Sequence, residues 1–242
     1  MNQQSHSRIV VLDTETTGIN MDAGPHYMGH KVIEIGAVEV VNRRLTGRHY
    51  HVYLKPNRKV DEEAIKVHGI TDDYLADKPV FSSQVDEFLQ FISGAELIAH
   101  NAPFDVGFLD YELTLIGRKE RIASLCKVTD TLAMARKMYP GKRNNLDVLC
   151  TRYGIDNSHR SLHGALLDAE ILADVYLLMT GGQTKLNLQS DGQQQGDGGA
   201  IHRLDSSRAP LKIIRADAQE LQNHEARLDL VMEKGGSCLW RT

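Results

Sequence analysis

An apolar run that ends in acids constrains the fold of this chain most strongly. Residues 9–12 are all apolar, and Asp13 and Glu15 follow them almost at once. A continuous apolar run is typical of a strand that is buried on both faces of its sheet. Side chains i and i+2 of a strand point to the same face, so Asp13 and Glu15 would project together if the strand continues through them. Two adjacent carboxylates repel each other, and a bound divalent cation would relieve that repulsion.

The pattern up to about residue 180 favours an α/β domain. Besides the first strand at residues 8–13, strands are predicted at residues 31–41, 49–54, 96–100 and, as an edge strand, 127–131. Helices are predicted at residues 61–68, 81–92, 103–116, 131–138, 145–153 and 163–179. Strands first, and then strands that alternate with helices, indicate a mixed sheet covered on both faces.

The composition changes at Gly181. Residues 181–200 contain six glycines and five glutamines, which is typical of a flexible linker. This linker separates an expected domain at residues 1–180 from a short docking segment at residues 201–242. The last segment combines a strand-like stretch at residues 211–216 with a predicted helix at residues 217–234.

The net charge, the cysteine count and the length of the apolar runs exclude several classes of protein. The net charge is -4, whereas a protein that holds long nucleic acid by itself is usually basic. The three cysteines lie far apart, which argues against a disulfide framework or a CxxC zinc site and favours a reducing cytoplasm. No apolar run approaches the roughly 18 residues of a membrane span, and we expect neither a secretory signal nor a membrane partner.

Two further polar residues stand out near the helix predicted at residues 163–179. Asp168 falls on its apolar stripe, where an acid is rarely a solvated surface residue. His163 precedes Asp168 by five positions, about 140° around a helix, so we expect the histidine at or before the helix start. The ordinary alternatives are a carboxylate satisfied by hydrogen bonds in the core and a histidine in a helix cap.

A further acid, Asp105, occupies a strand-to-helix crossover. It follows the short apolar strand predicted at residues 96–100, and open α/β sheets present their binding sites at such crossovers. The ordinary alternative is an acid that stabilises the start of a helix through the helix dipole.

Three short motifs carry a resemblance to a known family. DTETTG reads as DxE, HNAPFD as NxxFD and HGALLDA as HxxxxD. In this order they resemble the three motifs of the DnaQ-like (DEDDh) 3′–5′ exonucleases, over about residues 8–180. The resemblance implies a ribonuclease H-like three-layer domain, with a central mixed β-sheet flanked by helices. The linker and tail extend it to the proofreading epsilon subunits of bacterial DNA polymerase III, which act in the cytoplasm at the replication fork.

The resemblance assigns catalytic roles to five residues. Four acids would hold two divalent cations, Mg²⁺ or Mn²⁺, because hard oxygen donors suit these ions. They are Asp13, Glu15, Asp105 and Asp168. His163 would accept the proton of the attacking water. The expected reaction removes mispaired 3′-terminal nucleotides of DNA as 5′-monophosphates.

The same resemblance predicts which residues contact the DNA 3′ end. The expected substrate-binding residues are Asp13, Glu15, Glu63, His68 and Asp168. The backbone of residues 14–18 and the side chains of Asn101 and Phe104 are expected to line the same pocket. For Glu63 and His68 the ordinary alternative is a solvated helix face.

Protein partners are implied for the linker, the tail and the exonuclease domain. Gln183, Leu186 and Leu188, in the stretch at residues 183–188, resemble a motif that docks on the sliding clamp. Residues 201–242 are expected to bind the polymerase catalytic (alpha) subunit. The predicted contacts are Leu228, Val231 and Trp240. A small theta subunit on the exonuclease domain is a further partner that the resemblance allows.

Two other functions stay open from the sequence. An RNA 3′–5′ exonuclease of the same fold would carry the same three motifs, because neither the metal ligands nor the nucleophile distinguish the sugars. A catalytically silent docking subunit would use only the linker and tail. The intact acids and His163 argue against the silent subunit, and the linker and tail argue against a self-contained ribonuclease.

Overall fold

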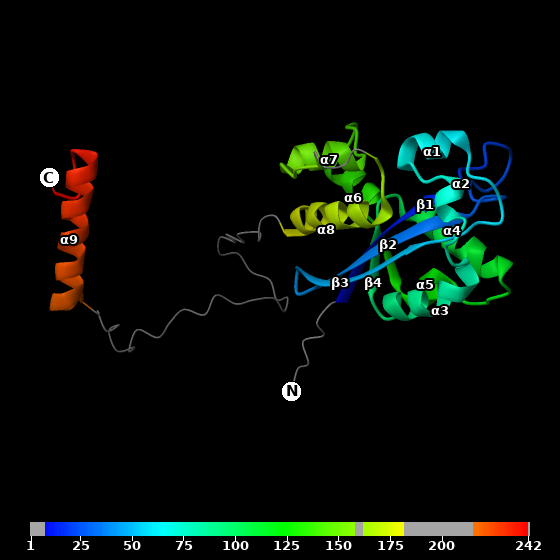
Figure 1. The fold of residues 1–242 in the computed structure, drawn as a ribbon, viewed down its shortest axis with the longest axis horizontal. Helices are drawn as coiled ribbons and strands as arrows, with labels where there is room; N and C mark the ends of the chain where they lie inside the picture. Colours follow the sequence, from blue (N-terminus) through cyan, green and yellow to red (C-terminus); the bar gives the residue numbers. More distant parts are fainter. Residues whose placement is uncertain (1–7, 158–161, 182–214, 242) are drawn as a thin grey trace, which may run out of the picture. The chain divides into compact units, whose positions relative to one another are not determined.

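The structure is a computed structural model that describes residues 8–157, 162–181 and 215–241 (Figure 1). The chain divides into two compact units, Met1–Leu186 and Asn187–Thr242. Gln183, Leu186 and Leu188 lie outside the described residues, as does most of the strand predicted at residues 211–216. Among the described helices, none is long and apolar enough to cross a membrane.

A five-stranded mixed sheet forms the centre of the first unit, in the order β3-β2-β1-β4-β5. The strands are β1 (Arg8–Thr16), β2 (Val32–Val41), β3 (Arg44–Tyr53), β4 (Glu96–Ala99) and β5 (Lys127–Asp130). The neighbours β1, β2 and β3 pair antiparallel, whereas β4 pairs parallel with β1 and with β5. The predicted mixed sheet is therefore confirmed, and β5 is its edge strand as expected.

The third strand begins earlier than the sequence pattern predicts. We expected it near residue 49, but β3 starts at Arg44 directly after a two-residue turn. Asn42 and Arg43 form this turn with φ angles of 51° and 61°. Positive φ at both central residues matches the twist of a β-hairpin, so the strands remain paired up to the turn itself.

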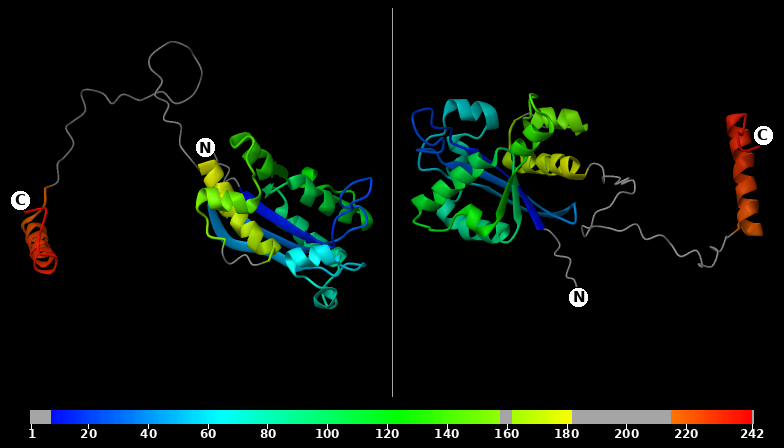
Figure 2. Two further views of the ribbon diagram at one scale, coloured as in Figure 1. Left: turned by 90° about the horizontal axis from the view of Figure 1, so that it is seen from above. Right: turned by 180° about the vertical axis from the view of Figure 1, so that it is seen from behind.

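Helices cover both faces of the sheet, as predicted (Figure 1). The helices are α1 (Glu62–His68), α2 (Asp72–Leu75), α3 (Phe81–Ile92), α4 (Ala102–Leu115), α5 (Ile122–Leu125), α6 (Thr131–Met138), α7 (Leu146–Tyr153) and α8 (Ala165–Gly181). The one-turn helices α2 and α5 were not predicted, because four residues are too few to show a period. Figure 2 shows from two further directions that α8 lies along the sheet.

Strand β1 contributes to the two larger of the three described hydrophobic clusters. Val10 and Leu12 belong to the core on the side of α3 and α4. Ile9 and Val11 belong to the core on the side of α7 and α8. Side chains alternate between the faces of a strand, so Asp13 and Glu15 continue the row of Ile9 and Val11 and emerge on the α8 side.

The second unit consists of α9 (Ala218–Gly235) and the residues that follow it. Asp217 and Glu220 form a capping box at its start, as their spacing predicts. Leu228 is buried, together with Cys238 of the returning tail. By contrast, Trp240 is 83% exposed.

Candidate active site

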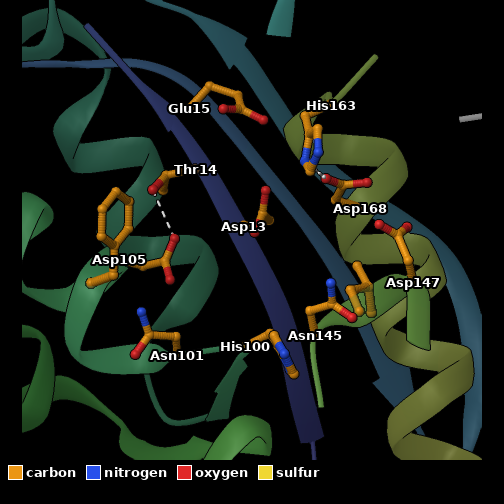
Figure 3. A pocket seen from close by; sticks show the side chains of 12 residues that line it. Asp13, Thr14, Glu15, His100, Asn101, Asp105, Asn145, Asp147, His163 and Asp168 are labelled. Atoms are coloured by element: carbon orange, nitrogen blue, oxygen red, sulfur yellow. Dashed lines mark hydrogen bonds and ion pairs between the residues drawn. The ribbon is translucent and has the colours of Figure 1, made fainter. Parts of the chain in front are cut away.

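Four separate segments of the first unit meet in one pocket at the carboxyl end of β1 (Figure 3). The pocket has a volume of about 360 Å³. All five predicted catalytic residues line it: Asp13, Glu15, Asp105, His163 and Asp168. In Figure 3 Asp13 lies between Asp105 on one side and His163 and Asp168 on the other.

A glycine on β2 allows α8 to approach the acids of β1. Gly36 lies opposite Asp13 in the strand register. A Cβ at Gly36 would collide with the backbone of Ala165 and Leu166, the first residues of α8. The start of the helix therefore rests directly on the sheet beside Asp13. Asp168, in the first turn of α8, reaches the pocket from this position and is only 3% exposed.

His163 lies just before α8, which confirms its predicted position ahead of the helix. Its side chain is 45% exposed, and its Nδ1 lies 3.3 Å from Oδ2 of Asp168. The backbone N–H of His163 donates a hydrogen bond of 3.1 Å to the carbonyl of Val67 in α1. The histidine thus faces both solvent and the acids, which is the placement that a proton-transfer group requires.

Asp105 reaches the pocket from the opposite side. It lies in the first turn of α4, where Asn101 precedes the helix with φ of 72°. The hydroxyl of Thr14 donates a hydrogen bond of 2.8 Å to Oδ1 of Asp105. Burial raises the pKa of Asp105 to about 7, and the hydrogen bond from Thr14 opposes that rise. A nearby cation would favour the ionised carboxylate.

The donor set of the pocket fits a divalent cation. Single ligand atoms of Glu15, His163 and Asp168 all lie within 4.8 Å of one another. Asp13 and Asp105 line the same pocket with further carboxylate oxygens. Carboxylate oxygens are hard donors of the kind that bind divalent cations.

A second cavity of about 730 Å³ adjoins the first and shares Glu15 and Phe104 with it. Its lining is largely apolar and includes Ile19, Met21 and Val67. The ring of Phe104 stacks on His26, with 5.0 Å between the ring centroids. An apolar, aromatic hollow of this kind can accept a nucleobase.

Glu63 and His68 both line this second cavity but differ in their surroundings. Glu63 is exposed and pairs with Lys66 at 2.7 Å. His68 is buried, and its Nδ1 accepts a hydrogen bond of 3.0 Å from the backbone N–H of Ile70. Its Nε2 therefore carries the proton and donates to the carbonyl of Thr16 at 3.2 Å. Burial lowers the pKa of His68, which keeps the ring neutral.

The pocket also contains side chains that sequence reasoning missed. They are His100, Asn145, Leu146 and Asp147. Asn145 accepts a hydrogen bond of 3.1 Å from the backbone of Val148 and so caps α7. An asparagine before a helix signals the helix start, but nothing in the local pattern indicates that this start faces the acids.

Comparisons with known proteins agree with this geometry. A family model described as Exonuclease matches residues 10–176. The chain is 61% identical to DNA polymerase III subunit epsilon of Salmonella typhimurium over 239 residues, which cover 97% of this chain and 98% of that one. It is equally similar to the protein of that name from Escherichia coli, with the same identity and coverage. The corresponding values for Haemophilus influenzae are 54% identity over 246 residues, covering 97% of this chain and 94% of that one.

Solved structures resemble the first unit at low sequence identity. The nuclease domain of 3′hExo, a DEDDh family member bound to rAMP, matches with a TM-score of 0.61 and 18% identity, covering 74% of this chain and 94% of that one. Exonuclease X in complex with 5′ overhanging duplex DNA matches with a TM-score of 0.55 and 22% identity, covering 72% and 91%. At such identities the likeness concerns the fold, and it confirms the predicted ribonuclease H-like architecture.

Proposed function

This chain belongs to the epsilon subunits of DNA polymerase III, within the exonuclease family, and from that premise we propose a mechanism for it. The protein is a 3′–5′ exonuclease that proofreads DNA replication as a subunit of the polymerase. The proposed reaction hydrolyses the last phosphodiester bond of a mispaired DNA 3′ end and releases a nucleoside 5′-monophosphate. We place it in the bacterial cytoplasm, at the replication fork.

The enzyme uses divalent metal ions, as the exonuclease fold implies. We propose two ions, Mg²⁺ or Mn²⁺, held by four carboxylates. These are Asp13, Glu15, Asp105 and Asp168. When bound, such ions lower the pKa of an attacking water and offset negative charge on the phosphate and the leaving oxygen. Of these acids, Asp105 and Asp168 are buried, and burial raises the pKa of Asp105, so a bound cation would favour the ionised form of that carboxyl.

His163 is the proposed general base. Its half-exposed imidazole can exchange protons with solvent, and its Nδ1 lies 3.3 Å from Asp168. The carboxylate of Asp168 can therefore orient the ring and stabilise its protonated form after proton transfer. Histidine is the side chain that most often serves as a general base.

The second cavity is the proposed binding site of the terminal nucleotide. Its apolar lining beside Glu15 and Phe104 would take the base, while the acids of the first pocket face the phosphate. The proposed substrate-binding residues are Asp13, Glu15, Glu63, His68 and Asp168. Since both ring nitrogens of His68 have protein partners, its contribution would be to shape the pocket rather than to bind through those atoms.

The remaining parts of the chain would deliver the nuclease to the primer end. We propose an exonuclease domain at residues 1–180, a linker at residues 181–200 and a polymerase-binding segment at residues 201–242. The alpha subunit would bind this last segment, the sliding clamp would bind residues 183–188, and a theta subunit could bind the exonuclease domain. Tethering raises the local concentration of the nuclease, which would compensate for the weak DNA binding expected of a protein with a net charge of -4.

The observation that carries the proposal is the convergence of the acids and His163 in one pocket, within a chain that matches epsilon subunits over nearly its full length. The test uses the full chain with DNA primers whose 3′ terminus is either paired or mispaired. With Mn²⁺ or Mg²⁺ we expect release of 5′-mononucleotides, faster from the mispaired end, and no release in a chelator. A matched RNA oligonucleotide tests the ribonuclease alternative.

Single substitutions test which residues act as metal ligands and which as the general base. Asp13→Ala and Asp168→Ala should abolish nucleotide release, while Glu170→Ala, an exposed acid two positions from Asp168 on α8, should not. His163→Ala should lower kcat by about 10²–10⁴-fold, the usual contribution of a general base, and should leave Mn²⁺ affinity unchanged in a calorimetric titration. Near-normal activity of Asp13→Ala or Asp168→Ala would contradict the proposed metal site.

A further inference from the structure

The segment that carries His163 is attached to the end of α1 by two contacts. The first is the hydrogen bond of 3.1 Å from the backbone N–H of His163 to the carbonyl of Val67. The second is a packing contact one residue earlier, where Leu162 lies over Gly69. A Cβ at Gly69 would stand only 2.7 Å from Cδ1 of Leu162, so the methyl group occupies the space that a side chain would otherwise fill.

The packing of Leu162 against α1 depends on the conformation of Gly69. Gly69 is the C-cap of α1, with φ of 75°, and its backbone N–H donates a hydrogen bond of 2.7 Å to the carbonyl of Ile65. Residues other than glycine rarely adopt this left-handed conformation. The same glycine thus ends α1 and leaves an open surface for Leu162, whose side chain is half covered although it lies at the protein surface.

The end of α1 is itself fastened to the strand that carries the catalytic acids. Buried His68 donates from Nε2 to the carbonyl of Thr16, the residue after Glu15. Its Nδ1 accepts from the backbone of Ile70, so the ring is held from both sides. A continuous set of contacts therefore leads from β1, through the last turn of α1, to the backbone of His163.

We propose that Leu162 is a positioning residue for His163. Packed on Gly69, it holds the segment in register so that the bond to Val67 forms and the imidazole keeps a fixed position relative to Asp13 and Glu15. The helix ladder of α8 starts one residue later, with the bond from the N–H of Asp168 to the carbonyl of Gly164, so this contact supplies order that the helix does not. The inference rests on the proposed role of His163 as the base.

The kinetic test is Leu162→Ala in the full chain. A displacement of about 1 Å can reduce the rate of an oriented reaction about 100-fold, and we expect partial loss of order to lower kcat about ten-fold. KM and Mn²⁺ affinity should change little, because the acids and the second cavity are untouched. Leu162→Met, which can still reach Gly69, should restore most of kcat. The matched control is Leu178→Ala, a similarly exposed leucine on α8, which should leave kcat unchanged.

A second readout does not depend on activity. In the metal-free protein, hydrogen exchange of the His163 amide, followed by NMR, should be slowed by its bond to Val67. The exchange should accelerate in Leu162→Ala and stay slow in Leu178→Ala. Unchanged exchange in Leu162→Ala, or wild-type kcat in that variant, would overturn the inference. If His163→Ala itself keeps full turnover, the proposed base is wrong, whereas the exchange result still decides whether Leu162 orders this segment.

Discussion

At the scale of single residues, Asp105 links the chemistry of the site to the stability of the fold. Burial raises its pKa to about 7 from an ordinary value of 3.8. Between these values the unfolded chain has lost the proton and the folded, metal-free protein has kept it. The folded state then binds more protons than the unfolded state, so this group makes the protein less stable as pH rises from about 4 to 7.

Asp105→Asn should remove this dependence and keep an acceptor for the hydroxyl of Thr14. In a chelator, we expect the Tm of the variant minus that of the wild type to increase from pH 4 to pH 7 and to level off above. Mn²⁺ at pH 7.5 should raise the Tm of the wild type more than that of the variant. Asp73→Asn, at an exposed position of α2, serves as the control. A difference in Tm that does not vary with pH would show that Asp105 is ionised in the metal-free protein.

At the scale of elements, the approach of α8 to β2 determines whether the acids can act together. The helix start rests on Gly36, and a side chain there would collide with the backbone of Ala165 and Leu166. Gly36→Ala should push α8 away and cost about 1–3 kcal/mol of unfolding free energy, as overpacking usually does. Because Asp168 moves with the helix while Asp13 and Glu15 stay on β1, Mn²⁺ affinity should fall as well.

Denaturant unfolding and a calorimetric Mn²⁺ titration measure these two effects. The control is Gly164→Ala, at a position on the same helix approach where a Cβ meets nothing within 4 Å. It should preserve both stability and metal affinity. Wild-type Mn²⁺ affinity in Gly36→Ala would mean that the spacing between α8 and β1 does not control the metal site.

At the scale of the whole molecule, we expect the first unit to fold and act without the second unit. The described hydrophobic cores of the first unit draw on residues between 9 and 179, so a chain that ends after Gly181 should stay folded. It should retain nucleotide release from single-stranded DNA and lose association with the polymerase alpha subunit. Size-exclusion chromatography of the mixed subunits, with a nuclease assay on the same fractions, checks both outcomes. Full-affinity binding by the truncated protein would place the polymerase contact on the first unit.

Within the second unit, Trp240 is the expected anchor for the polymerase. Arg241 pairs with Asp229 at 2.6 Å and also with Glu225, which holds the tail against α9 while Trp240 remains exposed. Exposed aromatic anchors often dominate binding energy, so Trp240→Ala should weaken alpha binding by about 10–100-fold. The comparable change Leu115→Ala, on the exonuclease domain, should leave that affinity unchanged. Leu228 is buried within the unit, so its contribution would be to support the tail.

Much of the order of strands and helices could be predicted from the sequence, because local patterns of apolar residues indicate each element. The unbroken apolar run of β1 indicated a strand buried on both faces, and the position of Asp168 on an apolar stripe predicted its burial. His163 was expected ahead of its helix from a simple angular argument. The motifs that carry the family resemblance are local as well, so the exonuclease family could be recognised before any contact was known.

Only the tertiary structure decided how these pieces meet. Thr14 donates to Asp105 across 91 positions of sequence, Gly36 accommodates the start of α8, and Leu162 finds its seat on Gly69. Asn145 caps α7 and also lines the pocket, a juxtaposition that no local pattern indicates. The periodicity of a segment reports which of its faces is buried, but it contains no information on which distant segment covers that face. Close approach between segments depends on the packing of the whole sheet and its helices, and packing is settled only when the chain is folded.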